Sequence, residues 1–250
     1  MILLADYKLI IIIYVFYSNH NTAGFIYGIL FINAKRSGYC IMKNILCYGD
    51  SNTWGYIPGG RGRYAHDVRW TGVAAAMLGD DYRIIEEGLN GRTTVFDVPF
   101  DPELNGKKHF MCSLMSHAPL DLVIIMLGTN DLMYGHTAWE ASRGCVSLIK
   151  TALNSALQFA AAKPEVLLLA PILIGKNIAD IDQSPLALSG RAESKKFAAL
   201  YEAAALRFGA GFLDAAKYAE PSCIDCEHME ADDHRRLGEA VAIKIREMLG

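Results

Sequence analysis

The sequence lacks the excess of basic residues that nucleic-acid-binding proteins carry. Its 250 residues include 24 lysines and arginines against 27 aspartates and glutamates, which gives a net charge of −3, and no block of like charges occurs. Contact with phosphate backbones requires a basic patch or stripe, so we expect no nucleic acid partner. Charged residues make up only 20% and apolar residues 52%, a composition that excludes disorder and predicts a globular chain with a sizeable core.

Cysteines are too few and too scattered for a disulfide framework or a zinc site. The sequence has six, and only Cys223 and Cys226 have the C-x-x-C spacing of a redox motif or of half a zinc site. A second pair is missing, whereas structural zinc takes four ligands. We therefore expect no bound metal, and the scattered thiols favour a reducing compartment, the cytoplasm.

A continuous apolar run of membrane-spanning length is also missing. Residues 9–17 and 23–32 are apolar, but five polar residues, Ser-Asn-His-Asn-Thr, separate them. Each run is shorter than the ~20 residues that a spanning helix needs, and burying the polar residues at mid-membrane would be costly. The basic region and cleavage site of a signal peptide are not recognisable either.

The first 41 residues are therefore set apart from the rest of the chain. Met42-Lys43-Asn44 leads straight into an apolar strand, as at the start of a cytoplasmic α/β domain. We interpret residues 1–41 as an upstream extension, with a misplaced start codon as its origin, and residues 42–250 as one domain. The alternative is a leader that tethers the protein to a membrane or directs its export, and we expect contact with a membrane only in that case.

From residue 42 onward, apolar strand patterns alternate with helix patterns. Strands are predicted over residues 45–48, 82–86, 120–127, 166–170 and 211–214, and helices over 70–78, 138–162, 191–208 and 232–248. Residues 88–118 and 172–190 are predicted to be irregular. The alternation predicts a three-layer α/β/α domain, a doubly wound fold around a central, mainly parallel five-stranded sheet.

Polar residues follow four of the predicted strands, where each strand ends. Ser51 follows the first strand, Gly91 the second and Asn130 the third, while Asp225 and His228 follow the fifth. Ligands of such sheets bind outside the carboxyl ends of the strands. Together these residues supply a hydroxyl nucleophile, a base, an orienting acid and amide donors for an oxyanion, the parts of an acyl-transfer site.

Each of these signals is weak alone, because Gly-Asp-Ser and Asp-x-x-His also occur in ordinary turns. His234 is a competing base, but it falls within the last predicted helix without an acid three residues earlier, so we interpret it as a solvated residue. Asp50 is interpreted as an acceptor that stabilises the turn before Ser51. Asp131 and Arg92 are predicted to brace their loops.

Four blocks of the sequence resemble, in order, those of the SGNH (GDSL) hydrolase superfamily. They are Gly49-Asp50-Ser51, Gly91, Gly128-Thr129-Asn130-Asp131 and Asp225-x-x-His228, and the match extends over nearly all of residues 42–250. The segments 67–70, 86–94 and 121–131 resemble the arylesterase/acyltransferase (perhydrolase) branch in particular. Two residues depart from this pattern: Asn52 stands where the usual motif has leucine, and Met229 stands where many members have proline. Residues 172–190 match the branch poorly.

The resemblance implies a flavodoxin-like fold and a serine esterase without a metal or organic cofactor. By it, Ser51 is the nucleophile and Asp225 and His228 are the acid and base; Ser51 N–H, Gly91 N–H and the Asn130 amide form the oxyanion hole. Trp54 would form a wall of the acyl pocket, with core packing as the alternative. Members of the branch hydrolyse short-chain esters, pass acyl groups to alcohols or peroxide, and in some cases assemble into octamers, which implies a small-molecule ester substrate and a homo-oligomer.

Two alternative functions remain open at the level of sequence. A carbohydrate deacetylase of the acetyl-xylan type would use the same machinery on the same scaffold. A catalytically silent binding protein, tethered to a membrane by residues 1–41, is the alternative from outside the enzymes.

Overall fold

The computed structural model describes residues 2–5, 8–19, 22–32, 42–60, 62–154, 163–182 and 185–250. Contacts between Cα atoms divide the chain into two units, Met1–Ile41 and Met42–Gly250, which we describe separately. That the first unit is an upstream extension stays a prediction.

The described part of the first unit is a three-stranded antiparallel sheet. Its strands are β1 (Ile2–Ala5), β2 (Lys8–Asn19) and β3 (Thr22–Ile32), in the order β1-β2-β3. The two apolar runs of the sequence coincide with β2 and β3, which pair from Leu9 with Ile32 to Asn19 with Thr22. Throughout the described residues of the chain, none of the helices has the length and apolar character needed to cross a membrane.

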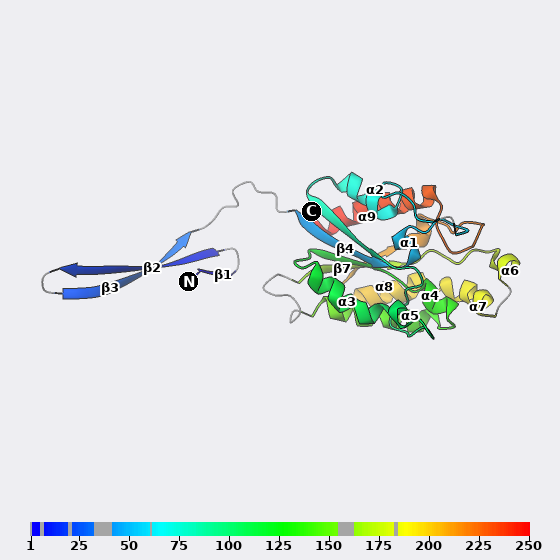
Figure 1. Cartoon of the computed structure of the whole chain (residues 1–250), viewed down its shortest axis with the longest axis horizontal. Helices are drawn as coiled ribbons and strands as arrows, with labels where there is room; N and C mark the ends of the chain where they lie inside the picture. The colour runs from blue at the N-terminus through cyan, green and yellow to red at the C-terminus, as the bar shows by residue number, and fades with distance from the viewer. Residues whose placement is uncertain are drawn as a thin grey trace. The chain divides into compact units, whose positions relative to one another are not determined.

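The second unit is built around a five-stranded sheet in which all neighbouring strands are parallel (Figure 1). The strands are β4 (Lys43–Gly49), β5 (Tyr82–Gly88), β6 (Leu122–Met126), β7 (Glu165–Ala170) and β8 (Gly211–Asp214). Their order, β5-β4-β6-β7-β8, is the flavodoxin-like order of doubly wound sheets. This confirms the predicted fold class.

Alternate residues of the central strands face opposite helical layers, as the period of two in a strand requires. Ile45 and Ile124 belong to one buried cluster, together with residues of α2 (Trp70–Leu78) and α9 (Ala231–Leu249). Figure 1 shows these two helices on the same side of the sheet. Both faces of the central strands are thus buried, which explains their continuous apolar sequences.

The other face of the sheet is covered by α3 (Gly106–Ser116), α5 (Ala138–Ala152) and α8 (Phe197–Phe208). Leu46 and Ile125 belong to the cluster on this side. α5 begins with a capping box, in which the Thr137 hydroxyl accepts from the Glu140 N–H and the Glu140 carboxylate accepts from the Thr137 N–H. The remaining helices are short: α1 (Ser51–Trp54), α4 (Thr129–Met133), α6 (Ile178–Ile181), α7 (Pro185–Ser194), η1 (Pro102–Leu104) and η3 (Ala215–Lys217).

Four predictions of secondary structure differ from the structure. α3 lies in residues 88–118, which were predicted to be irregular; Asn105 caps it by accepting from the Lys107 N–H at 3.0 Å, and only Phe110 and Leu114 supply an i, i+4 apolar contact surface. α6 and the first part of α7 likewise lie in residues 172–190, which were also predicted to be irregular. The predicted helix 191–208 is two helices, because α7 ends at Ser194 and α8 begins at Phe197. α5 ends at Ala152, and residues 155–162 of its predicted continuation lie outside the described residues.

Candidate active site

Ser51 lies at the sharp turn between strand β4 and the short helix α1. The Asp50 carboxylate caps this helix by accepting from the Asn52 N–H at 3.0 Å. Gly49 is required by close packing, since a Cβ atom there would lie 2.1 Å from Thr53 Oγ1. Gly55 ends the helix with a φ of +88°, in the left-handed region that favours glycine. The turn therefore fixes the serine at the carboxyl end of a central strand.

Ser51, His228 and Asp225 lie in one chain of hydrogen bonds. His228 Nε2 is 2.9 Å from Ser51 Oγ, and His228 Nδ1 is 3.0 Å from Asp225 Oδ2. With Nδ1–H donating to the carboxylate, Nε2 is left to accept the serine proton. The three residues that were predicted to form a nucleophile, base and acid thus come together across 177 positions of the sequence.

The Asp225 carboxylate is held in its charged form by several donors. Oδ1 accepts from the N–H groups of Glu227 at 3.2 Å and His228 at 3.1 Å, and Oδ2 accepts from the Gly59 N–H at 3.1 Å. Burial acts to raise its pKa, but the hydrogen bonds from His228 and Glu227 outweigh burial and lower the pKa to about 2. Asp225 is therefore an anion at any pH at which the imidazole can act as a base.

Asn52 joins the nucleophile turn to the loop that carries His228. Its Oδ1 accepts from the Met229 N–H at 3.0 Å, and its Nδ2 donates to the Glu227 carbonyl at 3.0 Å. The same loop is closed on its other side by the Ser222 N–H, which donates to the His228 carbonyl at 2.7 Å. The sequence marked Asn52 only as a departure from the usual leucine and gave it no role.

Tyr56 is a second residue to which the sequence gave no role. Its ring lies against the imidazole of His228, with 4.3 Å between the ring centroids and 36° between the planes. The contact limits rotation of the imidazole on the side that the hydrogen bonds leave open. The local sequence does not predict this contact, because a tyrosine two residues after a tryptophan is equally typical of a residue that packs in the core.

The predicted oxyanion donors lie at the carboxyl ends of the neighbouring strands. Asn130 is in α4, directly after β6, and its Nδ2 donates to the Arg92 carbonyl at 3.1 Å. An amide nitrogen carries two hydrogens, so the second is left for a ligand. Gly91 has a φ of +78°, and within the described residues its N–H has no hydrogen-bond acceptor.

Arg92 and Asp131 brace the loops that carry these donors. Arg92 Nη1 donates to the carbonyls of Gly49, at 2.8 Å, and of Glu87. Asp131 is fully buried and accepts from the N–H of Thr94, at 3.0 Å, and from its hydroxyl. Burial raises the pKa of Asp131 to about 7 and that of Asp50 to about 6. The site thus contains two buried carboxyl groups besides Asp225.

Trp54 lies at the edge of the nucleophile turn and is half-buried. The Arg63 guanidinium is 4.9 Å from the centre of its ring, and Arg63 Nε donates to the Trp54 carbonyl at 2.7 Å. The ring centroid of Tyr56 is 6.4 Å away. These contacts fix Trp54 beside Tyr56, the residue that lies against His228. The role of Trp54 as a wall of an acyl pocket stays a prediction.

The prediction that His234 is solvated was wrong. Its side chain is fully buried, Nδ1 accepts from the Trp70 N–H at 3.3 Å, and the Tyr64 ring meets it edge-on at 5.3 Å. Burial lowers the pKa of His234 to about 3, so it is a neutral residue that ties α9 to the start of α2. Among the described residues, no group of three or more histidine, cysteine, aspartate or glutamate side chains is placed to hold a metal ion.

Comparisons with known proteins identify the family. Residues 47–239 match the model of the GDSL-like Lipase/Acylhydrolase family. No curated protein matches the chain, but solved structures do. Est24, a carbohydrate acetylesterase from Sinorhizobium meliloti, is 39% identical with a TM-score of 0.78, and the match covers 83% of this chain and 100% of that one. The native aryl esterase of M. smegmatis is 38% identical with a TM-score of 0.76, over 83% of this chain and 100% of that one.

The chain therefore belongs to the GDSL-like lipase/acylhydrolase family, within the SGNH hydrolase superfamily. It is a carboxylic ester hydrolase, and its substrates are small-molecule esters.

Proposed function

We propose that the protein cleaves short-chain carboxylic esters by two-step acyl transfer through Ser51. The observation that carries this proposal is the chain of hydrogen bonds from Ser51 Oγ through His228 to Asp225, at 2.9 and 3.0 Å. Such an arrangement activates a hydroxyl that would otherwise be a weak nucleophile.

In the first step, His228 Nε2 takes the proton of Ser51 as Oγ attacks the ester carbonyl. Asp225 holds Nδ1–H and stabilises the imidazolium that forms. The N–H groups of Ser51 and Gly91 and the Asn130 amide donate to the oxyanion of the tetrahedral intermediate. The imidazolium then gives its proton to the departing alcohol, which leaves an acyl group on Ser51.

In the second step, water attacks the acyl-enzyme with His228 again as the base, and collapse of the intermediate returns the serine. An alcohol or peroxide in place of water gives acyl transfer instead. Similarity to the aryl esterase of M. smegmatis supports short-chain aryl esters as substrates. No step requires a metal or an organic cofactor, and Trp54 is proposed to line the acyl side of the cleft.

The second candidate function is deacetylation of a carbohydrate. It is favoured by the 39% identity to Est24, a carbohydrate acetylesterase. The chemistry at Ser51 would be the same, and only the alcohol part of the ester would differ.

A homo-oligomer in the cytoplasm is also proposed. Phe100 is fully exposed and has a φ of +70°, in a turn closed by the Asp101 N–H and the Val98 carbonyl at 3.1 Å. A bulky residue in the left-handed region is strained, and contact with a second copy of the chain would bury its exposed ring.

The free thiols of the described cysteines support a reducing compartment. Residues 1–41 are proposed to be an extension, with membrane contact only if they act as an anchor.

Turnover of p-nitrophenyl acetate tests the esterase proposal. Ser51→Ala should lose ~10³-fold or more of kcat, the scale of a lost nucleophile, while Ser116→Ala, an exposed serine at the end of α3, should match the wild type. A Ser51→Ala protein that is folded by circular dichroism and still turns over the ester at the wild-type rate would refute it. Turnover of acetylated xylan without turnover of aryl esters would favour the deacetylase.

A further inference from the structure

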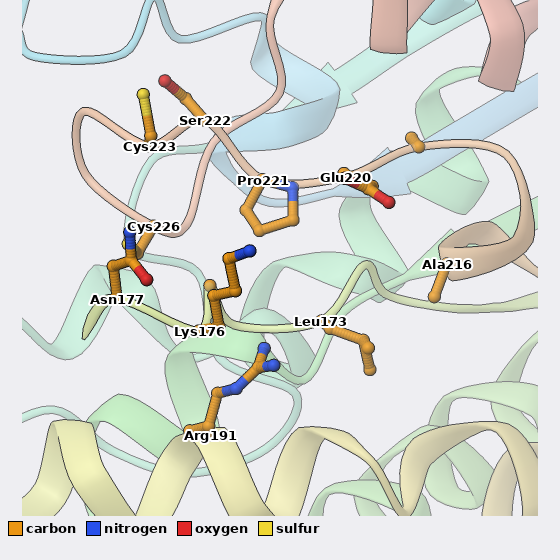
Figure 2. Close-up of a pocket in the computed structure, with 12 residues that line it drawn as sticks. Leu173, Lys176, Asn177, Arg191, Ala216, Glu220, Pro221, Ser222, Cys223 and Cys226 are labelled. Carbon is orange, nitrogen blue, oxygen red and sulfur yellow. The ribbon is translucent and has the colours of Figure 1, made fainter. Parts of the chain in front are cut away.

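A cavity of about 360 Å³ lies at the carboxyl ends of β7 and β8, next to the loop that carries Asp225 (Figure 2). The loop after β7 forms one wall through Leu173, Gly175 and Lys176. Pro221 and Cys226 belong to the opposite wall. The two walls meet where the Gly175 N–H donates to the Cys226 carbonyl at 2.7 Å. Neither Ser51 nor His228 lines the cavity, so it is separate from the proposed site of ester cleavage.

Two cations point into this cavity from the same side. Figure 2 shows the Lys176 ammonium group and the Arg191 guanidinium group close to one another and directed toward the space below Pro221. Arg191 comes from α7, and its Nη1 donates to the Ile174 carbonyl, which fixes the guanidinium on the cavity wall. The geometry thus presents a rigid planar donor beside a mobile point charge.

Neither cation is neutralised by an acidic residue that the structure describes. Of the ion pairs formed within the described residues, none includes Lys176 or Arg191. Among the described residues that line the cavity, Glu220 is the one with a carboxylate, and it comes from the loop after β8, on the other wall. The charged residues of the lining therefore leave a formal charge of +1, from two cations and one carboxylate.

We propose that this cavity binds a small organic carboxylate. Its carboxylate group would accept hydrogen bonds from Arg191 and Lys176, as carboxylates do from guanidinium and ammonium groups. Its apolar part would pack on Leu173, Ala219 and Pro221. The volume is at the small end of the range for ligand sites, roughly 300–1,000 Å³, which restricts the ligand to a few carbon atoms or a single ring.

The charge of the lining argues for a monoanion. A carboxylate neutralises the net charge of +1, whereas the dianion of a phosphate monoester would leave an unpaired negative charge close to Glu220. The apolar residues of the lining argue against a bare inorganic ion, because such an ion would leave them in contact with water. A carboxylate with an apolar body satisfies both parts of the wall.

Calorimetric titration of the full-length protein with benzoate tests the proposal, with benzamide as the neutral probe of equal shape. We expect saturable binding of benzoate and none of benzamide at the same concentrations. Lys176→Gln should weaken benzoate binding about 3- to 10-fold, as for loss of one charged contact. Lys163→Gln, which removes an exposed lysine before β7, should leave the affinity unchanged. Arg191→Gln, which keeps a donor for the Ile174 carbonyl, should weaken binding at least as much as Lys176→Gln.

Two further titrations distinguish this cavity from the proposed ester site and from a phosphate site. Benzoate should still bind after Ser51 has been blocked with phenylmethanesulfonyl fluoride, and phenyl phosphate should bind more weakly than benzoate at pH 8. Benzoate binding that is lost on blocking and unaffected by Lys176→Gln would overturn the proposal. So would equal binding of benzamide, or tighter binding of phenyl phosphate. The Lys176→Gln and Lys163→Gln titrations report on the cavity directly, so their results do not depend on whether Ser51 is the nucleophile.

Discussion

The side chain of Asn52 is hydrogen-bonded to the main chain on both sides of His228. It accepts from the Met229 N–H and donates to the Glu227 carbonyl, each at 3.0 Å. Asn52 is buried and directly follows Ser51. The two bonds therefore join the turn of the nucleophile to the loop of the base, and they set the separation of Ser51 Oγ and His228 Nε2.

Replacing Asn52 with leucine should lower activity more than its effect on stability explains. The variant removes both bonds and leaves a buried N–H and a carbonyl without partners, at a cost of about 1–3 kcal/mol each. We expect kcat to fall about 10- to 100-fold with little change in KM, because a small displacement of a catalytic pair is costly. The measurements are kcat and KM for p-nitrophenyl acetate, together with unfolding by urea.

A control for stability alone is Asn44→Ala. Asn44 Nδ2 donates to the Pro119 carbonyl at 3.0 Å. Asn44 lies near the start of β4, at the opposite end of this strand from Ser51. This variant should lose stability and keep kcat. If Asn52→Leu keeps the wild-type kcat, Asn52 does not position His228.

Asp225→Asn should abolish most of the activity without unfolding the protein. An asparagine can still accept from the N–H groups of Glu227 and His228, but it cannot stabilise an imidazolium as a carboxylate does. We expect kcat to fall about 10²- to 10⁴-fold, as for the orienting acid of other serine triads. Since the pKa of Asp225 is about 2, the wild type should show no separate loss of kcat from this carboxyl group at any pH above about 4.

The matched control is Asp232→Asn, in the first turn of α9. The Asp232 side chain is 82% exposed, and its ion pair with Arg235 is long, with 3.7 Å between Oδ1 and Nε. Such surface pairs contribute little, so kcat should stay within about two-fold of the wild type. Equal effects of the two substitutions would remove Asp225 from the mechanism.

Asn130→Ala tests the proposed oxyanion hole. Loss of one preorganised donor lowers kcat about 10²- to 10³-fold in comparable sites, and we expect the same here with KM nearly unchanged. Asn154→Ala, an exposed asparagine after α5, serves as the control. A fall in kcat/KM that comes from KM alone would assign Asn130 to substrate binding.

The sheet could be predicted from the sequence because its central strands are apolar on both faces. Ile45, Ile124 and Leu168 are fully buried, and continuous runs of this kind have few alternatives. α3 could not be predicted in the same way, since it packs through Phe110 and Leu114 while its remaining residues are mostly polar or exposed. Its position depends on the sheet that it covers.

The contacts of the site likewise include some that could be predicted from the sequence and some that could not. That Ser51 and His228 would lie near each other could be predicted, because both follow parallel strands and these end at one edge of the sheet. The contact of Tyr56 with His228 could not, since it joins residues far apart in sequence through ring geometry alone. His234 was misjudged for a related reason. Its burial depends on the packing of α9 against α2 and on Tyr64, which no local pattern records.

His234 should make the protein acid-sensitive. Burial, followed by the charges of Arg69 and His228, lowers its pKa to about 3, whereas an unfolded histidine has a pKa of about 6.5. Between these values the unfolded state binds more protons than the folded state. The contribution of His234 to the free energy of unfolding is thus fully present above pH 6.5 and is lost as the pH falls toward 3, by a total on the order of 5 kcal/mol.

Substitution with glutamine removes this titration and keeps an acceptor for the Trp70 N–H, which His234 Nδ1 binds at 3.3 Å. His234→Gln should therefore be less stable than the wild type at pH 7.5, and this difference should shrink or reverse at pH 4.5. Urea unfolding at both values measures the change, and His109→Gln, an exposed histidine in α3, should follow the wild type at each. Because Asp131, with its pKa of about 7, gives the opposite slope, the difference between variant and wild type isolates the histidine. A difference that is the same at both pH values would mean that His234 has the same pKa in the folded and unfolded states, as a histidine accessible to water would, and is not buried as a neutral acceptor.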